Sequence, residues 1–257
     1  MTDDEIRAED DRLITVDVAR AVEENEFVPY VQPLYDMANG KILAGEALVR
    51  WTLPEDGSVI PAALFVPSLE HTNTICGLDW FMIDGLTEYI GSVVGTEAAV
   101  PIALNISYQH GKDPEFSKRL AATADWHKAP HGNVSIELSE ATLLKGDEGV
   151  EQLVRTAVAD GFVVVADNLQ TGTEGLRTIA ELGIRHVKVS ASIWRDRPEM
   201  LPELVSVAKE LGIRLCAERV EQSEEAHMLV AAGIGVGMGY LFAQPMDLQS
   251  FKALCEK

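Results

Sequence analysis

The sequence predicts an α/β fold, a TIM-like (β/α)8 barrel whose first strand runs antiparallel to the rest. Apolar strand candidates alternate with helical segments along the chain, and the middle candidates are continuous apolar runs, typical of parallel strands buried on both faces. The first two candidates are joined only by residues 36–41, which is too short for a parallel crossover. We therefore expect them to form an antiparallel hairpin that turns at Asn39-Gly40.

Taken in order, the strand candidates are residues 27–35, 42–51, 100–107, 133–140, 162–169, 186–190, 214–220 and 235–243. The helical segments between them include residues 114–127, 146–161, 174–183, 202–212 and 224–233. Several of these segments end in a glycine just past the last periodic residue, which is a common helix stop.

Composition narrows the classes of function. A chain of 257 residues with 47% hydrophobic content suits a well-packed α/β domain, and we predict an acidic N-terminal extension over residues 1–15 and the barrel over residues 16–257. The net charge of −20 disfavours DNA and RNA as partners, since polyanion binding needs basic patches. The acidic N-terminus, the absence of a long apolar run and the odd number of cysteines predict a cytoplasmic protein with no membrane segment and no structural disulfide.

Polar residues recur where the predicted strands end, which is the end of such a barrel that carries chemistry. The polar residues are Glu46, Arg50, Asn105, Glu137, Glu140, Asp167, Asn168, Lys188, Glu218 and Glu221. The apolar Met238 stands at the corresponding place in the last strand. Carboxylates and an amide are hard oxygen donors that suit Mg²⁺, Mn²⁺ or Ca²⁺, and a lysine among them suits a phosphate or an attacking water. A single acid at a strand end is often only a helix cap or an ion-pair partner. Acids that recur at the same end of several strands favour a shared metal site.

Several motifs, in order along most of the chain, resemble those of the EAL domains, the cyclic di-GMP phosphodiesterases of bacterial signalling. "GEALVRW" resembles the signature that names the family, and "IALNIS", "IELSEATLL", "ADNLQTG", "CAERVE" and "MGYLFAQP" are similar to its "VNLS", "LEITES", "DDFGTG", "AEGVE" and "QGYLFSKP" segments. The resemblance implies hydrolysis of one phosphodiester of cyclic di-GMP to linear pGpG, assisted by Mg²⁺ or Mn²⁺. Ca²⁺ is expected to bind without supporting turnover.

The resemblance also implies roles for individual residues. Metal ligands are implied at Glu46, Asn105, Glu137, Asp167 and, for a second ion, Asn168. Catalytic roles are implied for Lys188, which holds the attacking water, for Glu218 and for the nearby Glu221. Ligand contacts are implied at Gln32 beside a guanine base, at Arg50 on a phosphate and at Met238 on the base-facing edge.

The sequence departs from the family pattern at several of these positions. Asn168 replaces the second Asp of "DDFGTG", and Leu169-Gln170 replaces the Phe-Gly that follows it. Ser190, Arg219 and Met238 replace an Asp, a Gly and a Gln of later motifs. We therefore expect a phosphodiesterase with impaired catalysis. A catalytically silent cyclic di-GMP receptor and a protein-interaction module stay open as alternatives, as do a homodimer and a protein partner.

Overall fold

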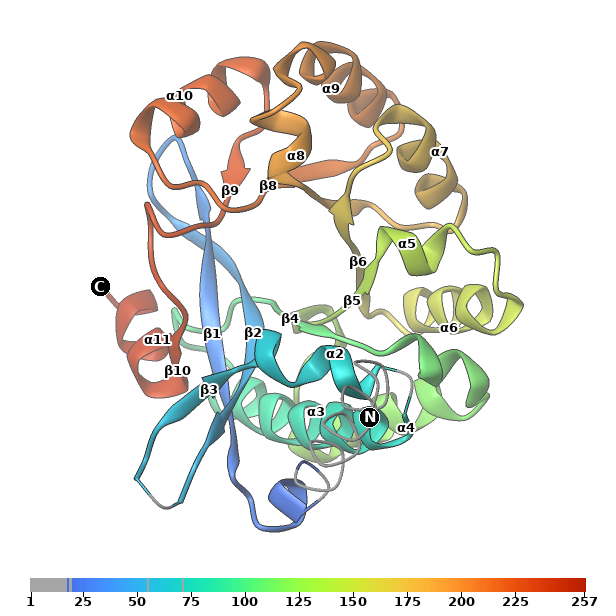
Figure 1. Cartoon of the computed structure of the whole chain (residues 1–257), viewed down its shortest axis with the longest axis vertical. Coiled ribbons are helices and arrows are strands. Elements are labelled where there is room, and N and C mark those ends of the chain that lie inside the picture. The colour runs from blue at the N-terminus through green and yellow to red at the C-terminus, as the bar shows by residue number, and fades with distance from the viewer. Residues whose placement is uncertain (1–17, 19, 55, 71) are drawn as a thin grey trace, which may run out of the picture.

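The computed structural model describes residue 18 and residues 20–54, 56–70 and 72–257. The extension expected over residues 1–15 lies outside the described residues. A closed barrel of eight strands with helices around it forms the body of the molecule, as the sequence predicts (Figure 1). Its strands are β1 (Phe27–Asp36), β2 (Ile42–Thr52), β4 (Ile102–Asn105), β5 (Val134–Ser139), β6 (Val163–Leu169), β7 (His186–Val189), β8 (Arg214–Ala217) and β9 (Val236–Gly237).

The first strand is reversed, as predicted. β1 pairs antiparallel with both of its barrel neighbours, β2 and β9, whereas the other neighbouring barrel strands pair parallel. The turn between β1 and β2 contains Gly40 with φ +74°, and the Gly40 N–H donates to Asp36 O at 2.8 Å. β1 and β2 form a long ribbon that extends past the barrel (Figure 1). β3 (Val59–Pro61) pairs antiparallel with the end of β2, and β10 (Met246–Asp247) pairs antiparallel with Tyr30 and Val31 of β1.

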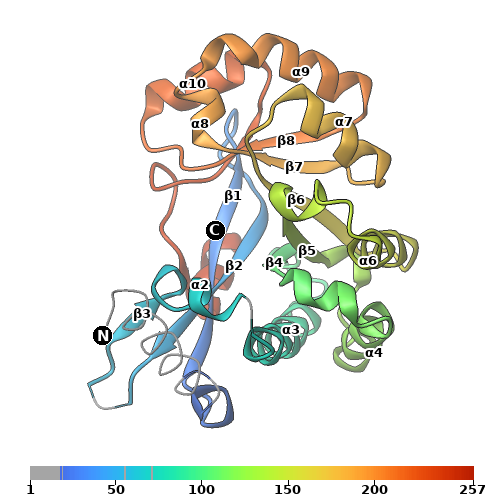
Figure 2. The same cartoon turned by 45° about the vertical axis from the view of Figure 1, so that its right-hand side comes forward.

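The helices lie outside the ring of strands (Figures 1 and 2). The longer ones are α3 (Thr74–Ser92), α4 (Phe116–His127), α6 (Glu148–Ala159), α7 (Thr173–Glu181), α9 (Leu201–Glu210), α10 (Ser223–Ala232) and α11 (Leu248–Cys255). The short ones are α2 (Val66–Leu69), α5 (Glu140–Leu143) and α8 (Ala191–Trp194). Of the longer helices, α3 and α11 were not among the segments singled out from the sequence. No helix in the described ranges is long and apolar enough to cross a membrane.

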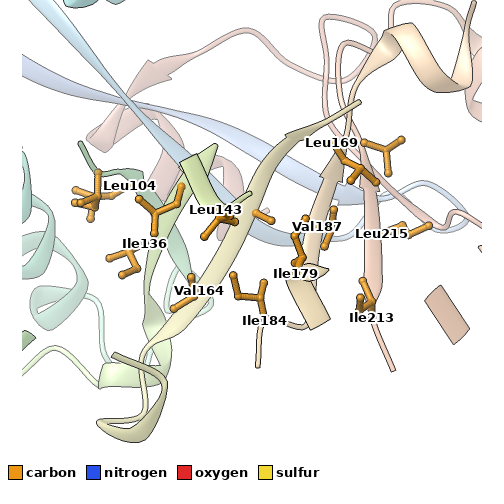
Figure 3. Close-up of a cluster of buried hydrophobic side chains, with 14 of the residues drawn as sticks. Leu104, Ile136, Leu143, Val164, Leu169, Ile179, Ile184, Val187, Ile213 and Leu215 are labelled. Atoms are coloured by element: carbon orange, nitrogen blue, oxygen red, sulfur yellow. The ribbon is translucent and has the colours of Figure 1, made fainter. Parts of the chain in front are cut away.

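The main hydrophobic core lies between the strands and these helices. Alternate apolar residues of β5 to β8, such as Ile136, Val164, Val187 and Leu215, are buried against helix residues such as Ile179 (Figure 3). β-branched side chains pack well on a pleated surface, which explains why these short runs form strands. The core fixes the strands from outside and leaves their carboxyl ends free to carry polar groups.

The last predicted strand is much shorter than expected. It was predicted over residues 235–243, but β9 ends at Gly237, and the chain then packs against the segment that follows β8. Val220 N–H donates to Met238 O at 2.9 Å, and Leu241 N–H donates to Val220 O at 3.1 Å. A Cβ at Gly239 (φ +153°) would lie 2.1 Å from Val220 O, so this close approach requires glycine. The two segments therefore form a packed edge of the barrel mouth.

Candidate active site at the barrel mouth

A buried lysine forms the centre of the polar cluster at the strand ends. Lys188 Nζ, on β7, lies 2.6 Å from Glu137 Oε2, 2.7 Å from Glu46 Oε2 and 3.3 Å from Asp167 Oδ1. These acids come from β5, β2 and β6, and Lys188 and Glu137 are almost completely buried. The structure thus brings together three of the predicted metal ligands and one predicted catalytic residue.

Charge balance in this cluster is incomplete. Burial opposes protonation of Lys188, but Glu137, Glu46, Asp167 and Glu218 outweigh burial and hold the lysine pKa well above its ordinary value. Burial raises the pKa of Glu137, and the charges of Glu46 and Asp167 raise it further. Burial and Asp167 raise the pKa of Glu218 to about 8. In both acids burial is the largest cause of the raised pKa, and the negative charges of neighbouring carboxylates add to it.

The donor chemistry fits a divalent cation. Oδ1 of Asp167 is buried and accepts no hydrogen bond from any described residue, although Lys188 Nζ is 3.3 Å away. Asn105, at the end of β4, donates from Nδ2 to Glu46 Oε1 at 3.2 Å, so its amide group lies beside one of the carboxylates. The described part of the chain contains no group of three or more His, Cys, Asp and Glu side chains already arranged around a metal position. An ion that shared these carboxylates would have to displace the ammonium of Lys188 or use their other oxygens.

The carboxyl end of β6, at the barrel mouth, contains a β-bulge. The pairing of β6 with β7 shifts between Ala166 and Leu169, so that Asp167 and Asn168 occupy the irregular part of the strand. Asn168 has φ +57° and an exposed side chain, whereas Asp167 is partly buried at the cluster. Bulges of this kind redirect side chains beside active sites, and asparagine tolerates a left-handed backbone better than most residues. Asn168 therefore has a left-handed backbone, whereas Gln170, which replaces the glycine of the family motif, does not.

Two side chains hold the loop after β6, namely Glu140, which the sequence places among the polar residues at the strand ends, and Arg197, which it does not. Glu140 accepts hydrogen bonds from Gln170 N at 2.8 Å and from Thr171 N at 3.3 Å, and it is buried. Arg197 donates from Nη2 to Gln170 O at 3.0 Å. The acid in an apolar strand end was the available signal for Glu140. Arg197 contacts a backbone carbonyl from a distant loop, and no sequence pattern marks such a contact.

The loop after β8 is held in a similar way. Trp194 Nε1 donates to Glu218 O at 3.2 Å, and Arg195 Nη2 donates to Arg219 O at 2.9 Å. Arg219, which stands where the family pattern has glycine, has φ +55°. The Arg195 side chain also donates from Nε to Glu225 Oε1 at 2.8 Å, at the start of α10. Residues 194–197 therefore connect the loops after β6 and β8 through backbone carbonyls.

A pocket of about 380 Å³ opens beside the cluster, and most of the predicted ligand contacts line it. Its lining includes Gln32, Glu46, Glu218, Glu221 and Met238. Gln32 is buried and donates from Nε2 to Ala243 O at 3.0 Å, which fixes its amide group.

Arg50, Asn105 and Glu137 do not line this pocket. The Arg50 guanidinium lies 5.6 Å from the centre of the Tyr30 ring and donates to Val49 O at 3.0 Å. A second pocket of about 380 Å³ is lined by Asn105, Glu137, Ser107 and Asp79, among others. Asp79 Oδ2 accepts from Ser107 N at 2.9 Å and lies 3.0 Å from His110 Nε2, so a buried pair supports the loop after β4. No sequence pattern indicated this pair.

The comparisons with known proteins agree on one family. The family model of the EAL domain matches residues 15–245. Cyclic di-GMP phosphodiesterase PA2567 of Pseudomonas aeruginosa is 28% identical over 241 residues, which cover 91% of this chain and 40% of that protein. Cyclic di-GMP phosphodiesterase RocR of the same species is 26% identical over 246 residues, or 93% of this chain and 62% of that protein. The chain thus spans less than two thirds of the length of these curated relatives.

Solved structures show the same fold. The structure described as EAL enzyme Bd1971 with cAMP and cyclic di-GMP bound superposes with a TM-score of 0.86 at 22% identity, covering 97% of this chain and 70% of that one. The PaMucR phosphodiesterase in complex with cyclic di-GMP gives a TM-score of 0.83 at 22% identity, covering 93% of this chain and 99% of that one. At this level of identity the likeness concerns the fold alone.

Proposed function

The chain belongs to the EAL domain family, and we propose that it is a cyclic di-GMP phosphodiesterase domain with impaired catalysis, which forms pGpG in the presence of Mg²⁺ or Mn²⁺. The observation that carries the proposal is the convergence of Glu46, Glu137 and Asp167 on Lys188 within 3.3 Å. Relatives named cyclic di-GMP phosphodiesterases support the choice of substrate.

Each residue of the site has a role in this proposal. Glu46, Asn105, Glu137 and Asp167 would hold one divalent ion, and Asn168 would contribute a neutral amide to a second. When bound, such ions stabilise charge on the attacking and leaving oxygens of a phosphodiester. Lys188 donates a hydrogen bond to the attacking water. Glu218, with a pKa of about 8, exchanges a proton with that water near neutral pH, and Glu221 supports the same loop.

The ligand contacts follow from the pocket beside the cluster. Gln32 and Met238 line it and would face a guanine base. Arg50 lies outside this lining, and its contact with a phosphate rests on the family resemblance alone. Impairment is supported by Asn168, whose neutral and exposed side chain follows Asp167 where a second carboxylate would add a charge. We place the domain in the cytoplasm, and cell fractionation tests this location.

The second candidate function is a receptor that binds cyclic di-GMP without cleaving it. It is favoured by the intact pocket together with the altered residues Asn168, Gln170 and Met238. A protein-interaction module is the third candidate, supported by the net charge of −20 and the altered base-facing edge.

One experiment separates the three candidates. Cyclic di-GMP is titrated calorimetrically into the protein with Ca²⁺, and pGpG release is then followed chromatographically with Mg²⁺ or Mn²⁺. Binding followed by slow pGpG release supports the impaired enzyme, and binding without any pGpG supports the receptor. Absence of binding contradicts both and leaves the interaction module. Rapid turnover contradicts the proposed impairment.

A further inference from the structure

Arg219 brings an unpaired positive charge to the pocket beside the cluster. It lines the pocket of about 380 Å³ together with Gln32, Met238 and Tyr240. Its guanidinium forms no hydrogen bond or ion pair with any other residue that the structure describes. The positive charge still acts on the site, because it lowers the pKa of Glu218 in opposition to burial. A guanidinium without a protein partner in a pocket is available to an acceptor on a ligand.

The backbone fixes where this side chain begins. Arg219 has φ +55°, a conformation that is unfavourable for a residue with a Cβ atom and that glycine adopts freely. Arg195 holds the Arg219 carbonyl at 2.9 Å, so the conformation is supported from outside the pocket. An arginine in place of the glycine of the family motif therefore lowers local stability, and packing gives no compensating gain because the side chain is exposed. Neither the backbone conformation nor packing therefore accounts for an arginine at position 219.

The neighbouring Met238 indicates a role for Arg219 as a hydrogen-bond donor to a ligand. It stands where the family motif has glutamine, it is buried, and its thioether donates no hydrogen bond. Val220 N–H donates to Met238 O at 2.9 Å, so the segments that carry Arg219 and Met238 are in direct contact. Within one pocket, the chain has lost an amide donor at position 238 and gained a guanidinium donor at position 219.

We propose that Arg219 is a specificity-determining residue that donates two hydrogen bonds to O6 and N7 of a guanine base of cyclic di-GMP. The guanidinium fork matches these two acceptors, whereas adenine presents a donor in place of O6. The inference rests on the proposed function, because it names a new contact for the same ligand.

The test compares cyclic di-GMP with its 7-deazaguanine analogue, which has the same phosphates but lacks the N7 acceptor. Calorimetric titrations with Ca²⁺ use the wild type, Arg219→Gly, the Arg219→Gly/Met238→Gln double variant and the exposed control Arg155→Met. Wild type and control should bind cyclic di-GMP about 10-fold more tightly than the analogue. Arg219→Gly should lose this preference and should bind cyclic di-GMP about 10-fold more weakly than wild type. Its melting temperature should be unchanged or higher, because glycine relaxes the backbone. The double variant should recover part of the lost affinity.

Each contrary result has a distinct meaning. An equal loss of affinity for both ligands in Arg219→Gly would assign the guanidinium to a phosphate and overturn the base contact. Unchanged affinities in Arg219→Gly would overturn the inference while leaving the proposed function intact. A wild type that binds neither ligand would overturn the proposed function and the inference together.

Discussion

The two halves of the barrel mouth are built on different principles. The first half, which we call the preserved half, consists of Glu46, Asn105 and Glu137 on β2, β4 and β5. The second, the altered half, consists of Asn168, Gln170, Arg219 and Met238 in and after β6, β8 and β9. Glu46 and Glu137 are buried and lie within 2.7 Å of Lys188. In the altered half, Asn168, Gln170 and Arg219 have exposed side chains.

This difference in burial explains in which half of the mouth residues can be substituted. A buried carboxylate needs a partner, so the preserved half depends on Lys188, and removing that ammonium leaves Glu46 and Glu137 unpaired at a cost of about 3–5 kcal/mol. The loops of the altered half are fixed through their backbones by Glu140, Arg195 and Arg197. Their side chains are therefore replaceable without loss of the loop conformation. The side chains of the altered half can therefore change while the barrel stays intact.

The largest effect is expected from Lys188→Met, which removes the shared partner of the preserved half. The variant leaves Glu46, Glu137 and Asp167 without their cation, so the free energy of unfolding should fall by about 3–5 kcal/mol. Urea denaturation in EDTA measures the change. The exposed Lys41→Met should stay within about 0.5 kcal/mol of wild type. A Lys188→Met protein as stable as that control would show that the carboxylates do not depend on the lysine.

Glu46→Gln tests whether the preserved half holds an ion by itself. Loss of one carboxylate should weaken Mn²⁺ binding about 100-fold, because a charged ligand is replaced by a neutral one. Calorimetry or Mn²⁺ electron paramagnetic resonance gives the affinity, with the exposed Glu181→Gln at the end of α7 as the comparison. A crystal soaked in Mn²⁺ that shows no density among Glu46, Asn105, Glu137 and Asp167 would contradict the site.

The stability of the fold should depend on pH, because Glu218 loses its proton at a higher pH in the folded protein than in the unfolded chain. The pKa of Glu218 is about 8 in the folded protein against an ordinary value of 4.5. A folded pKa above the unfolded one stabilises the fold below the unfolded value, and this stability is lost as the pH rises towards 8. In EDTA, wild type should therefore lose about 1–3 kcal/mol more than Glu218→Gln between pH 5 and pH 8. Added Mn²⁺ should reduce the loss. Parallel pH profiles of the two proteins without metal would contradict this assignment.

Asn168→Asp should move the altered half towards the family pattern. The variant adds one formal charge at nearly constant volume, and aspartate also tolerates the left-handed backbone at this position. If the second ion limits turnover, pGpG formation should rise about 10- to 100-fold in Mg²⁺ or Mn²⁺. Chromatographic assays compare wild type, Asn168→Asp and Asn168→Asp/Gln170→Gly. No gain in either variant would place the limiting defect elsewhere.

The smallest effect is expected from Arg197→Met, which releases the loop of the altered half. Loss of its hydrogen bond to Gln170 O should lower the free energy of unfolding by about 1 kcal/mol. Amide hydrogen exchange should become faster in residues 169–172, while the strand residues around Glu137 keep their protection. Arg155→Met on the surface of α6 serves as the control. Equal exchange in both variants would show that the loop does not depend on Arg197.

The sequence predicted the fold through features that act locally. The six-residue connection at 36–41 excluded a parallel crossover, and the apolar runs at β5 and β6 required burial on both faces. The end of β9 was predicted wrongly because the chain leaves the sheet after Gly237, and Met238 and Leu241 form hydrogen bonds with Val220 in the segment after β8. That contact depends on the three-dimensional neighbour of Gly239 and not on its own sequence.

For the site, the sequence indicated which side chains meet and not how they are balanced. Acids in apolar strand ends predicted that Glu46, Glu137 and Asp167 would lie together, and they do. The roles of these residues stay predictions. The central place of Lys188 among the carboxylates depends on how β7 lies relative to β2, β5 and β6 across the barrel. The contacts of Arg195 and Arg197 to backbone carbonyls depend on loop geometry. Such contacts leave no periodic pattern in a sequence.

The reversed first strand has a consequence for synthesis on the ribosome. β1 and β2 can pair as soon as they emerge, because only a tight turn separates them. The other edge of β1 waits for β9 and β10, and about 200 residues separate Asp36 from Val236. At translation rates of about 5–20 residues per second, that edge stays without its strand partners for roughly 10–40 s. The nascent chain therefore carries an open β-edge through most of its elongation, and a chaperone that covers this edge would favour closure of the barrel over pairing between chains.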